Sequence, residues 1–264
     1  MSSFTQAGKV VIKVGTSTLT YENGKLNLRR MEELCGVISD LHNSGKQVVL
    51  VSSGAIGVGV GKLKLPKRPT DTVQKQALAA VGQCELMFMY DKFFGEYNQT
   101  VAQVLLTADD VGSATSRQNI ENTLEELLRM DIIPIVNEND TVSIAELEEG
   151  FGDNDTLSAI VADLVDADVL VMVTDIDGLY DGDPRVDPDA KRIPYVAEIT
   201  PEIEALAGAP GTSRGTGGMA TKVRAAKFAN ARGISCCVMS GTKPKDLHIL
   251  FDGGQIGTVF QGKR

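Results

Sequence analysis

Short apolar runs alternate with longer amphipathic stretches through most of this chain. The apolar runs are rich in Val and Ile and are continuous, as expected for strands that helices cover on both faces. They occupy residues 10–14, 48–52, 100–106, 132–136, 169–174 and 235–239. Between them, residues 28–42, 116–129 and 156–164 carry apolar side chains at helical spacing. This order predicts an α/β fold with a mainly parallel central sheet and helices on both faces.

Length and local composition favour one domain. The 264 residues, 42% of them hydrophobic, are enough for a large core. No internal repeat or low-complexity segment divides the chain. Residues 178–193 are rich in Asp, Pro and Gly, which predicts a loop or hairpin excursion. We therefore expect a single domain over residues 1–264, in which the part after about residue 168 forms a distinct lobe.

Composition also argues against several functional classes. A formal charge of −9, from 26 basic and 35 acidic residues, makes the chain a poor candidate for binding nucleic acid or an anionic membrane. No stretch approaches about 20 continuous apolar residues, so no membrane span is predicted. The first eight residues contain no apolar signal region. The spacing of the four cysteines matches neither a zinc site nor a redox pair. These features predict a cytoplasmic protein with reduced thiols.

Polar clusters follow four of the predicted strands. They occupy residues 13–16, 52–55, 137–140 and 174–175, which begin with Lys13, Ser52, Asn137 and Thr174. Ligands of parallel α/β sheets bind beyond the carboxyl ends of the strands. The sequence therefore predicts one ligand site to which all four clusters contribute.

Two lysines stand out because each has glycine beside it. Lys13 lies within an apolar strand pattern next to Gly15, where a lysine is expected to pair with an anion or to face solvent at the strand end. Lys222 begins a predicted helix after Gly217 and Gly218, and a helix N-terminus offers further N–H donors to phosphate. A polyphosphate held between the two lysines is the simplest use for both, which favours ATP-dependent phosphoryl transfer.

The glycine-rich segment 54–62 is open to two interpretations. It is not a Walker A motif, because Ile56 stands where the first glycine is needed and Leu63 follows Lys62. We interpret it as a glycine-rich turn. Ser53 and Gly54 then either bind an anion through backbone N–H groups or simply form the turn.

Three polar residues, Asp153, Asn154 and Asp155, precede an apolar helical stretch. One of them is explained as a helix cap, since Asp and Asn satisfy free N–H groups at a helix start. The other two are free to bind an ammonium group, a magnesium-bound water or a neighbouring lysine. We therefore expect this segment to belong to the site.

Taken together, six ordered segments resemble the amino acid kinase family, and within it the branch that phosphorylates glutamate. They are VIKVGT at 11–16, VSSGAI at 51–56, VNEND at 136–140, FGDNDTLS at 151–158, TDIDGLY at 174–180 and GGMATK at 217–222. The resemblance covers essentially the whole chain. Kinases of acetylglutamate and aspartate typically carry a Gly-Gly pair after the first lysine, whereas Thr16 follows Gly15 here.

The resemblance implies a three-layer α/β/α sandwich and a complete reaction. ATP, Mg²⁺ and L-glutamate would be the ligands and L-glutamyl 5-phosphate the product, in the first step from glutamate to proline. An N-terminal lobe, about residues 1–167, would bind glutamate, and a C-terminal lobe, about residues 168–264, would bind ATP. Proline would act as a feedback inhibitor, and the protein would be a homo-oligomer, either a dimer or a tetramer. The RNA-modification-like C-terminal domain of many relatives is expected to be absent.

The same resemblance implies roles for individual residues. Lys13, Lys222 and Asp155 would be catalytic, with Asp155 holding both lysines. The ATP-contacting set is Lys13, Thr174, Asp175, Thr216, Gly217, Gly218, Met219, Ala220, Thr221 and Lys222. The glutamate-contacting set is Ser53, Gly54, Ala55, Asn137, Asp140, Asp153 and Asn154. No dedicated protein ligand for the metal is expected, because Mg²⁺ commonly keeps several waters and binds through substrate phosphates.

Other functions stay open on the sequence. The same fold could phosphorylate aspartate, acetylglutamate, carbamate or a nucleoside monophosphate. A non-catalytic sensor of nucleotides or amino acids would bind ATP without forming product. A dehydrogenase is disfavoured, because Lys62 stands where a dinucleotide fingerprint needs its last glycine.

Overall fold

An eight-stranded sheet forms the centre of the computed structural model, which describes residues 2–143, 153–184, 187–208 and 218–263. The strands follow the order β3-β4-β2-β1-β5-β7-β8-β6. Neighbouring strands run parallel except β7 and β8. Their bounds are β1 Lys9–Val14, β2 Gln47–Val51, β3 Val101–Leu106, β4 Ile133–Glu138, β5 Val169–Thr174, β6 Tyr195–Val196, β7 Ser235–Ser240 and β8 Thr258–Phe260. The expected mainly parallel sheet is confirmed.

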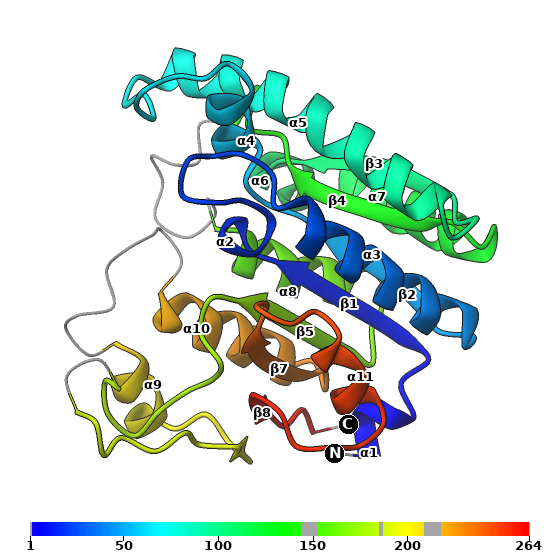
Figure 1. Cartoon of the computed structure of the whole chain (residues 1–264). Coiled ribbons are helices and arrows are strands. Elements are labelled where there is room, and N and C mark those ends of the chain that lie inside the picture. The colour runs from blue at the N-terminus through cyan, green and yellow to red at the C-terminus, as the bar shows by residue number, and fades with distance from the viewer. Residues whose placement is uncertain (1, 144–152, 185–186, 209–217, 264) are drawn as a thin grey trace.

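Helices cover both faces of this sheet (Figure 1). The described helices are α1 Ser2–Thr5, α2 Thr16–Leu19, α3 Leu28–Asn43, α4 Ala55–Lys62, α5 Thr72–Gly95, α6 Ala108–Gly112, α7 Ala114–Arg129, α8 Asn154–Leu164, α9 Pro201–Ala207, α10 Met219–Asn230 and α11 Asp246–Phe251. Helices α3, α5 and α11 contribute to one hydrophobic cluster, and α7, α8 and α10 to another. The arrangement is the expected α/β/α sandwich.

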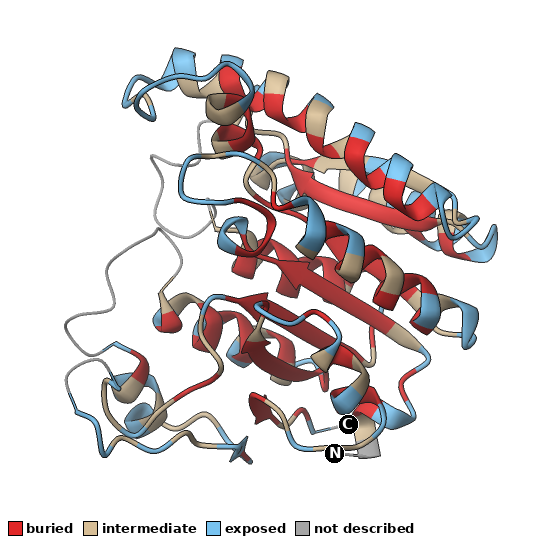
Figure 2. Cartoon of the chain, in the orientation of Figure 1, coloured by how far each residue is buried: buried red, intermediate tan, exposed pale blue. Residues whose placement is uncertain are grey.

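The two clusters arise from the alternation of side chains along each strand. In β1, Val10 and Ile12 join the cluster with α3 and α5, whereas Val11 joins the cluster with α8 and α10. Successive strand residues point to opposite faces, so a continuous apolar run supplies both cores. Figure 2 shows the result, with central strands buried along most of their length and exposed residues on the outer sides of the helices and in the loops.

Side-chain caps fix where several helices begin. The side chain of Asn27 accepts a hydrogen bond from the N–H of Arg30 at the start of α3. Asp71 does the same for Gln74 in α5, and Thr107 and Asp110 form a reciprocal capping box at α6. Each cap satisfies a backbone donor that lacks a partner in the first helical turn.

Six strands and three helices lie within two residues of their predicted bounds. The elements that were not predicted are the two short strands β6 and β8, the 24-residue helix α5 and the short helices α1, α2, α6, α9 and α11. The excursion over residues 178–193 is confirmed as hairpin-like, because Tyr180 and Arg192 form an antiparallel bridge. Within the described residues, no helix combines the length and apolarity that crossing a membrane requires.

The interpretation of segment 54–62 as a glycine-rich turn is wrong. Only Gly54 has turn geometry, with φ of 90°, and residues Ala55–Lys62 form helix α4. Two glycines of α4, Gly59 and Gly61, serve close packing instead. A Cβ on Gly59 would lie 2.1 Å from the carbonyl oxygen of Leu78 in α5, and a Cβ on Gly61 would lie 2.2 Å from that of Gly24. Glycine is needed here because backbones approach each other closely.

Candidate active site

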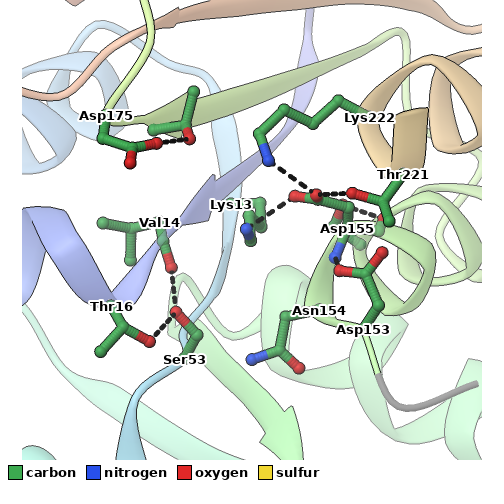
Figure 3. A network of polar contacts seen from close by, with 12 residues as sticks. Lys13, Val14, Thr16, Ser53, Asp153, Asn154, Asp155, Asp175, Thr221 and Lys222 are labelled. Atoms are coloured by element: carbon green, nitrogen blue, oxygen red, sulfur yellow. Dashed lines mark hydrogen bonds and ion pairs between the residues drawn. The ribbon is translucent and has the colours of Figure 1, made fainter. Parts of the chain in front are cut away.

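The polar clusters predicted from the sequence meet at the carboxyl edge of the sheet. The ends of β1, β2, β4 and β5 lie there, because these strands are parallel neighbours in the order β4-β2-β1-β5. The first residues of α8 join them through contacts with the end of β1 and the residue after β2. Figure 3 shows the resulting network of polar contacts.

Asp155 is the centre of this network. Its Oδ1 accepts a 2.6 Å hydrogen bond from Lys13 Nζ, and its Oδ2 accepts one of 2.9 Å from Lys222 Nζ. Thr221 Oγ1 donates a third, of 2.8 Å, to Oδ2. The exposed fractions are 0% for Asp155, 6% for Lys13 and 2% for Lys222. Two buried cations from opposite ends of the chain therefore share one buried carboxylate.

The charge of Asp155 depends on these lysines. Burial alone would raise the pKa of its carboxyl group. The charges and hydrogen bonds of Lys13 and Lys222 outweigh burial and hold the pKa of Asp155 below its usual range. Asp155 is thus an anion at neutral pH. A second anion approaching the lysines would meet two ammonium groups that this carboxylate already holds in place.

Asp153 caps α8 and is only partly satisfied. Its Oδ1 accepts a 2.8 Å hydrogen bond from the N–H of Asp155, which is the helix cap expected from the sequence. Its Oδ2 is buried and has no hydrogen-bond partner in the described structure. Burial, and then the neighbouring charge of Asp155, raise the pKa of Asp153. An unsatisfied carboxylate oxygen beside two lysines is a place where a ligand donor could bind.

Ser53 and Gly54 turn the chain between β2 and α4. Ser53 Oγ donates a 2.7 Å hydrogen bond to the carbonyl oxygen of Val14 at the end of β1, and Thr16 Oγ1 lies 3.4 Å from Ser53 Oγ. A Cβ on Gly54 would lie 2.9 Å from Thr16 Cγ2. Ala55 then begins α4, whose first N–H groups have no partner within the helix. This end of the helix is suited to an anion.

Two asparagines connect α8 to the strands. Asn154 Nδ2 donates to the carbonyl oxygen of Ser52 at 3.0 Å and to Asn137 Oδ1 at 3.3 Å. Asn137 in turn donates through Nδ2 to Oε1 of Gln83 in α5, at 2.8 Å. In the view of Figure 3, Asn154 lies between Ser53 and Asp153.

The remaining predicted residues are distributed around this centre. Thr174 is buried at the end of β5 and donates to Asp175 Oδ1 at 2.9 Å. Gly218, Met219 and Ala220 form the start of α10, which delivers Thr221 and Lys222. Asp140 follows β4 at an intermediate depth. Thr216 and Gly217, together with the Phe151-Gly152 part of one motif, lie outside the described residues.

The donor set of the described residues is compatible with a metal ion that arrives with its substrate. Among the described residues, no group of three or more His, Cys, Asp and Glu side chains could hold a metal ion. Mg²⁺ often binds through phosphates and one or two carboxylates while it retains several waters. The unpartnered Oδ2 of Asp153 is suited to accept a hydrogen bond from such a water.

Comparison with known proteins agrees with this geometry. The model of the amino acid kinase family matches residues 8–240. The chain belongs to the amino acid kinase family. It is 57% identical over 258 residues to a glutamate 5-kinase of Clostridium perfringens, covering 97% of this chain and 96% of that protein. It is 55% identical over 264 residues to a glutamate 5-kinase of Listeria monocytogenes, covering 99% of this chain and 96% of that protein.

Two solved structures have the same fold at low sequence identity. An isopentenyl phosphate kinase of T. acidophilum superposes with a TM-score of 0.67 at 18% identity, covering 96% of this chain and 100% of that one. A UMP kinase of Bacillus anthracis gives a TM-score of 0.65 at 15% identity, covering 98% and 97%. At these identities the likeness concerns the fold alone.

Two buried residues of the site were missed from the sequence. Gln83 contacts Asn137, and the hydroxyl group of Tyr90 lies 3.0 Å from Ser52 Oγ. Both belong to α5, which was not predicted. Their spacing of seven residues, two helical turns, is the one signal that could have placed them on a common face.

Proposed function

We propose that this chain transfers the γ-phosphoryl group of ATP to the side-chain carboxylate of L-glutamate. The product is L-glutamyl 5-phosphate, formed in the first step of proline biosynthesis. Family membership and the identity to two glutamate 5-kinases over nearly the whole chain support this reaction. The observation that carries the mechanism is the pair of buried lysines sharing Asp155.

The chemistry needs no general base. A free glutamate side chain has a pKa of about 4.3, so it is already a nucleophilic carboxylate at neutral pH. The obstacle is that one anion must approach another. Catalysis then rests on alignment and on fixed positive charge, as in other phosphoryl transfers. Lys13 and Lys222 supply two such charges in a buried place, where they act more strongly than in water.

We assign different positions to the two lysines. Lys13 lies over the phosphoryl group during transfer, because its strand ends beside Ser53 and Gly54 on the glutamate side. Lys222 stabilises the charge that develops toward ADP, because it follows the glycine-rich start of α10. Asp155 keeps both ammonium groups in position.

ATP is assigned to the lobe after about residue 168. Thr174, Asp175 and the segment 216–222 hold the nucleotide, with the N-terminus of α10 directed at phosphate. Mg²⁺ that arrives with ATP would supply positive charge to the phosphates there. Asp153 would hold a water of that ion, because its buried Oδ2 has no hydrogen-bond partner among the described residues.

Glutamate is assigned to the lobe before about residue 168. Ser53, Gly54 and Ala55 offer backbone N–H groups to a carboxylate of the substrate. Asp140 receives the α-ammonium group, and Asn137 and Asn154 orient the amino acid beside α8. Proline shares the α-amino and α-carboxylate groups, and so we propose that it competes at this pocket. If millimolar proline does not change the KM for glutamate, that competition is excluded.

The test is identification of the product. The purified protein is incubated with ATP, Mg²⁺ and a panel of acceptors: L-glutamate, L-aspartate, N-acetylglutamate, carbamate and UMP. Hydroxylamine traps acyl phosphates as hydroxamates, and mass spectrometry identifies them. The glutamate hydroxamate should dominate. A dominant product from another acceptor would reassign the substrate, and ATP binding without any product would indicate a sensor.

We also propose that the protein is a cytoplasmic homo-oligomer. The support for self-association is α5, whose outer face is apolar although it is exposed, with Val73 at 70% and Phe88 at 63%. A symmetric dimer needs only one such patch, because the same surface serves both subunits.

A further inference from the structure

Gln83 is a buried amide whose role the reaction scheme above does not use. It is 7% exposed and projects from α5 toward the end of β4. There it begins a chain of three side-chain amides, Gln83, Asn137 and Asn154, which ends at the first residue of α8. Asn137, in the middle, is 1% exposed. Water cannot readily replace a lost partner at such a depth.

Two backbone groups fix which way these amides point. The N–H of Glu138 donates to Asn137 Oδ1 at 2.9 Å, so the other end of that amide must be its NH₂ group. That NH₂ group faces Gln83, which must therefore present its oxygen. The carbonyl oxygen of Ser52 requires a donor, so Asn154 must direct its NH₂ group there.

Both hydrogens of Asn154 Nδ2 are thereby used within the protein. One goes to Ser52 O and the other to Asn137 Oδ1. What Asn154 can still offer a ligand is its Oδ1, an acceptor. At neutral pH, L-glutamate carries two carboxylates and one ammonium group, and the ammonium group is its strong hydrogen-bond donor.

We infer that Gln83 is a positioning and specificity residue, which orients Asn137 and through it Asn154 so that Asn154 Oδ1 accepts the α-ammonium group of glutamate. This inference rests on the proposed function. Gln83 itself touches no substrate. Without its oxygen, Asn137 Nδ2 loses its buried acceptor, and rotation of Asn137 would place its NH₂ group against two donors, Glu138 N–H and Asn154 Nδ2. Asn154 would then lose one of the two partners that hold its NH₂ group and would keep only the carbonyl oxygen of Ser52.

The test compares a ligand that has the ammonium group with one that lacks it. L-Glutamate is measured by its KM, and glutarate by its Ki as a competitive inhibitor, in wild-type protein and in Gln83→Met. Methionine keeps the length of the side chain, and its thioether is only a weak acceptor. The KM for L-glutamate should rise about tenfold, as for a lost hydrogen bond to a charged group, while the Ki of glutarate and the KM for ATP change less than about twofold.

Two further variants separate this role from general loosening of α5. Gln83→Glu keeps an acceptor oxygen and should preserve most of the preference for glutamate over glutarate. Tyr90→Phe removes the contact of α5 with Ser52 but leaves the amide chain intact, so it should not change that preference.

A change of equal size for glutamate and glutarate in Gln83→Met would overturn the inference, since a merely structural residue would affect both. So would an unchanged preference in a folded Gln83→Met protein. If Gln83→Met does not fold, the comparison uses Gln83→Glu and Asn154→Ala. The inference is then overturned if both variants lose the preference for glutamate over glutarate to the same extent. Failure of the wild-type protein to phosphorylate glutamate at all would instead contradict the proposed function.

Discussion

Lys13 and Lys222 depend on the same carboxylate, and this decides how substitutions in the site should behave. Breaking a buried ion pair by removing one partner commonly costs about 3–5 kcal/mol, because an unpaired charge stays buried. Removing Asp155 would leave two such charges, whereas removing either lysine leaves Asp155 with the other. Lysine substitutions therefore probe catalysis more cleanly than substitutions of Asp155.

Replacing Lys13 by Ala should lower turnover more than it weakens ATP binding. The ammonium group of Lys13 is assigned to the transferring phosphoryl group, where charge changes most. Removing one contact of this kind commonly reduces the rate by about 10²–10³. Steady-state kcat and the KM for ATP measure the two effects.

A matched control is Lys9→Ala, at the other end of the same strand. Lys9 pairs with the exposed Glu125 on the surface, and surface pairs contribute little to stability. Its turnover should stay near that of wild type. Near-normal turnover of Lys13→Ala itself would refute the catalytic assignment.

Asp153→Asn should raise the melting temperature at pH 7. Folding raises the pKa of Asp153, so the folded state binds its proton more tightly than the unfolded chain. Proton binding by Asp153 therefore stabilises the folded state at pH values below the ordinary pKa of a carboxyl group. This stabilisation is lost as the pH rises through the raised pKa of the folded state. At neutral pH the buried charge therefore costs stability. Asparagine removes the charge and keeps the cap on α8.

The measurement is the difference in melting temperature between Asp153→Asn and wild type across pH. At pH 7, the melting temperature should rise by about 2–4 °C for each kcal/mol that the substitution adds to the free energy of unfolding. This rise should become smaller as the pH falls toward 4, where Asp153 of the wild type is protonated too. Asp71→Asn exchanges the same residue types at the exposed cap of α5 and controls for the cap itself. A gain independent of pH would contradict the explanation.

The sequence predicted the charged residues of the site better than the amides behind them. Lys13, Asp155 and Lys222 stand out because charge is unusual beside apolar strands and helices, and the structure brings all three together. Their roles stay predictions. Gln83 carries no such signal, because an amide within a helical stretch usually faces solvent. Its burial depends on how α5 packs on α4.

That packing is the main element-scale feature of the site. Gly82 of α5 faces α4 so closely that a Cβ there would lie 1.8 Å from Ala55 O and 2.6 Å from Gly59 N. Ala55 is the first residue of α4, directly after Gly54. The contact between the helices therefore also fixes the turn assigned to glutamate.

Gly82→Ala should destabilise the protein and weaken glutamate binding together. The added methyl group overlaps backbone atoms, so the helices must separate, at a cost of about 3 kcal/mol or more. Urea denaturation measures the stability, and the KM for glutamate reports the displaced turn. ATP binding should change less.

Gly95→Ala, at the end of the same helix, is the matched control. A Cβ there would meet nothing within 4 Å, so the change should be neutral or stabilise the helix by up to about 1 kcal/mol. Equal stability of Gly82→Ala and Gly95→Ala would show that α4 and α5 are not held by this contact.

There are physical reasons why the sequence pattern did not reveal α5, β6, β8 and α4. Helix α5 carries apolar residues on its buried face and also on its outer face, so the pattern of one apolar stripe is missing. Strands β6 and β8 have two and three residues, which is too short for any periodicity to show. The glycines of α4 indicated a turn, because close packing of backbones leaves the same residues as a turn does.

At the scale of the whole molecule, Asp155 joins the two proposed lobes. Lys13 comes from β1 and Lys222 from α10, so one carboxylate before residue 168 holds one lysine from each side of that boundary. The sheet is continuous across it, since β1 pairs with β5 over five residue pairs. Any closing of one lobe on the other would act directly on the ion pairs at Asp155.

Whole-molecule assembly is expected to depend on the outer face of α5. Val73, Ala77, Ala80, Cys84 and Phe88 are all exposed and recur at helical spacing, and none of the exposed residues from 73 to 88 is charged. A helix that is apolar on all sides is normally buried. A charged partner would find no complementary charge there, whereas a second copy presents the same apolar stripe.

Phe88→Glu should therefore shift the protein from the proposed oligomer toward monomer. The substitution places a charge within the proposed desolvated contact, where the exposed residues of the stripe offer no counter-charge. Sedimentation velocity over a range of concentrations measures the mass in solution. Ile249→Glu changes another exposed apolar residue, on α11, and should leave the assembly unchanged. A monomeric wild-type protein, or equal assembly of wild type and Phe88→Glu, would exclude α5 as the contact. Because Gln83 lies on the buried side of this helix, a real dimer would place its contact directly behind the amide chain that orients Asn154.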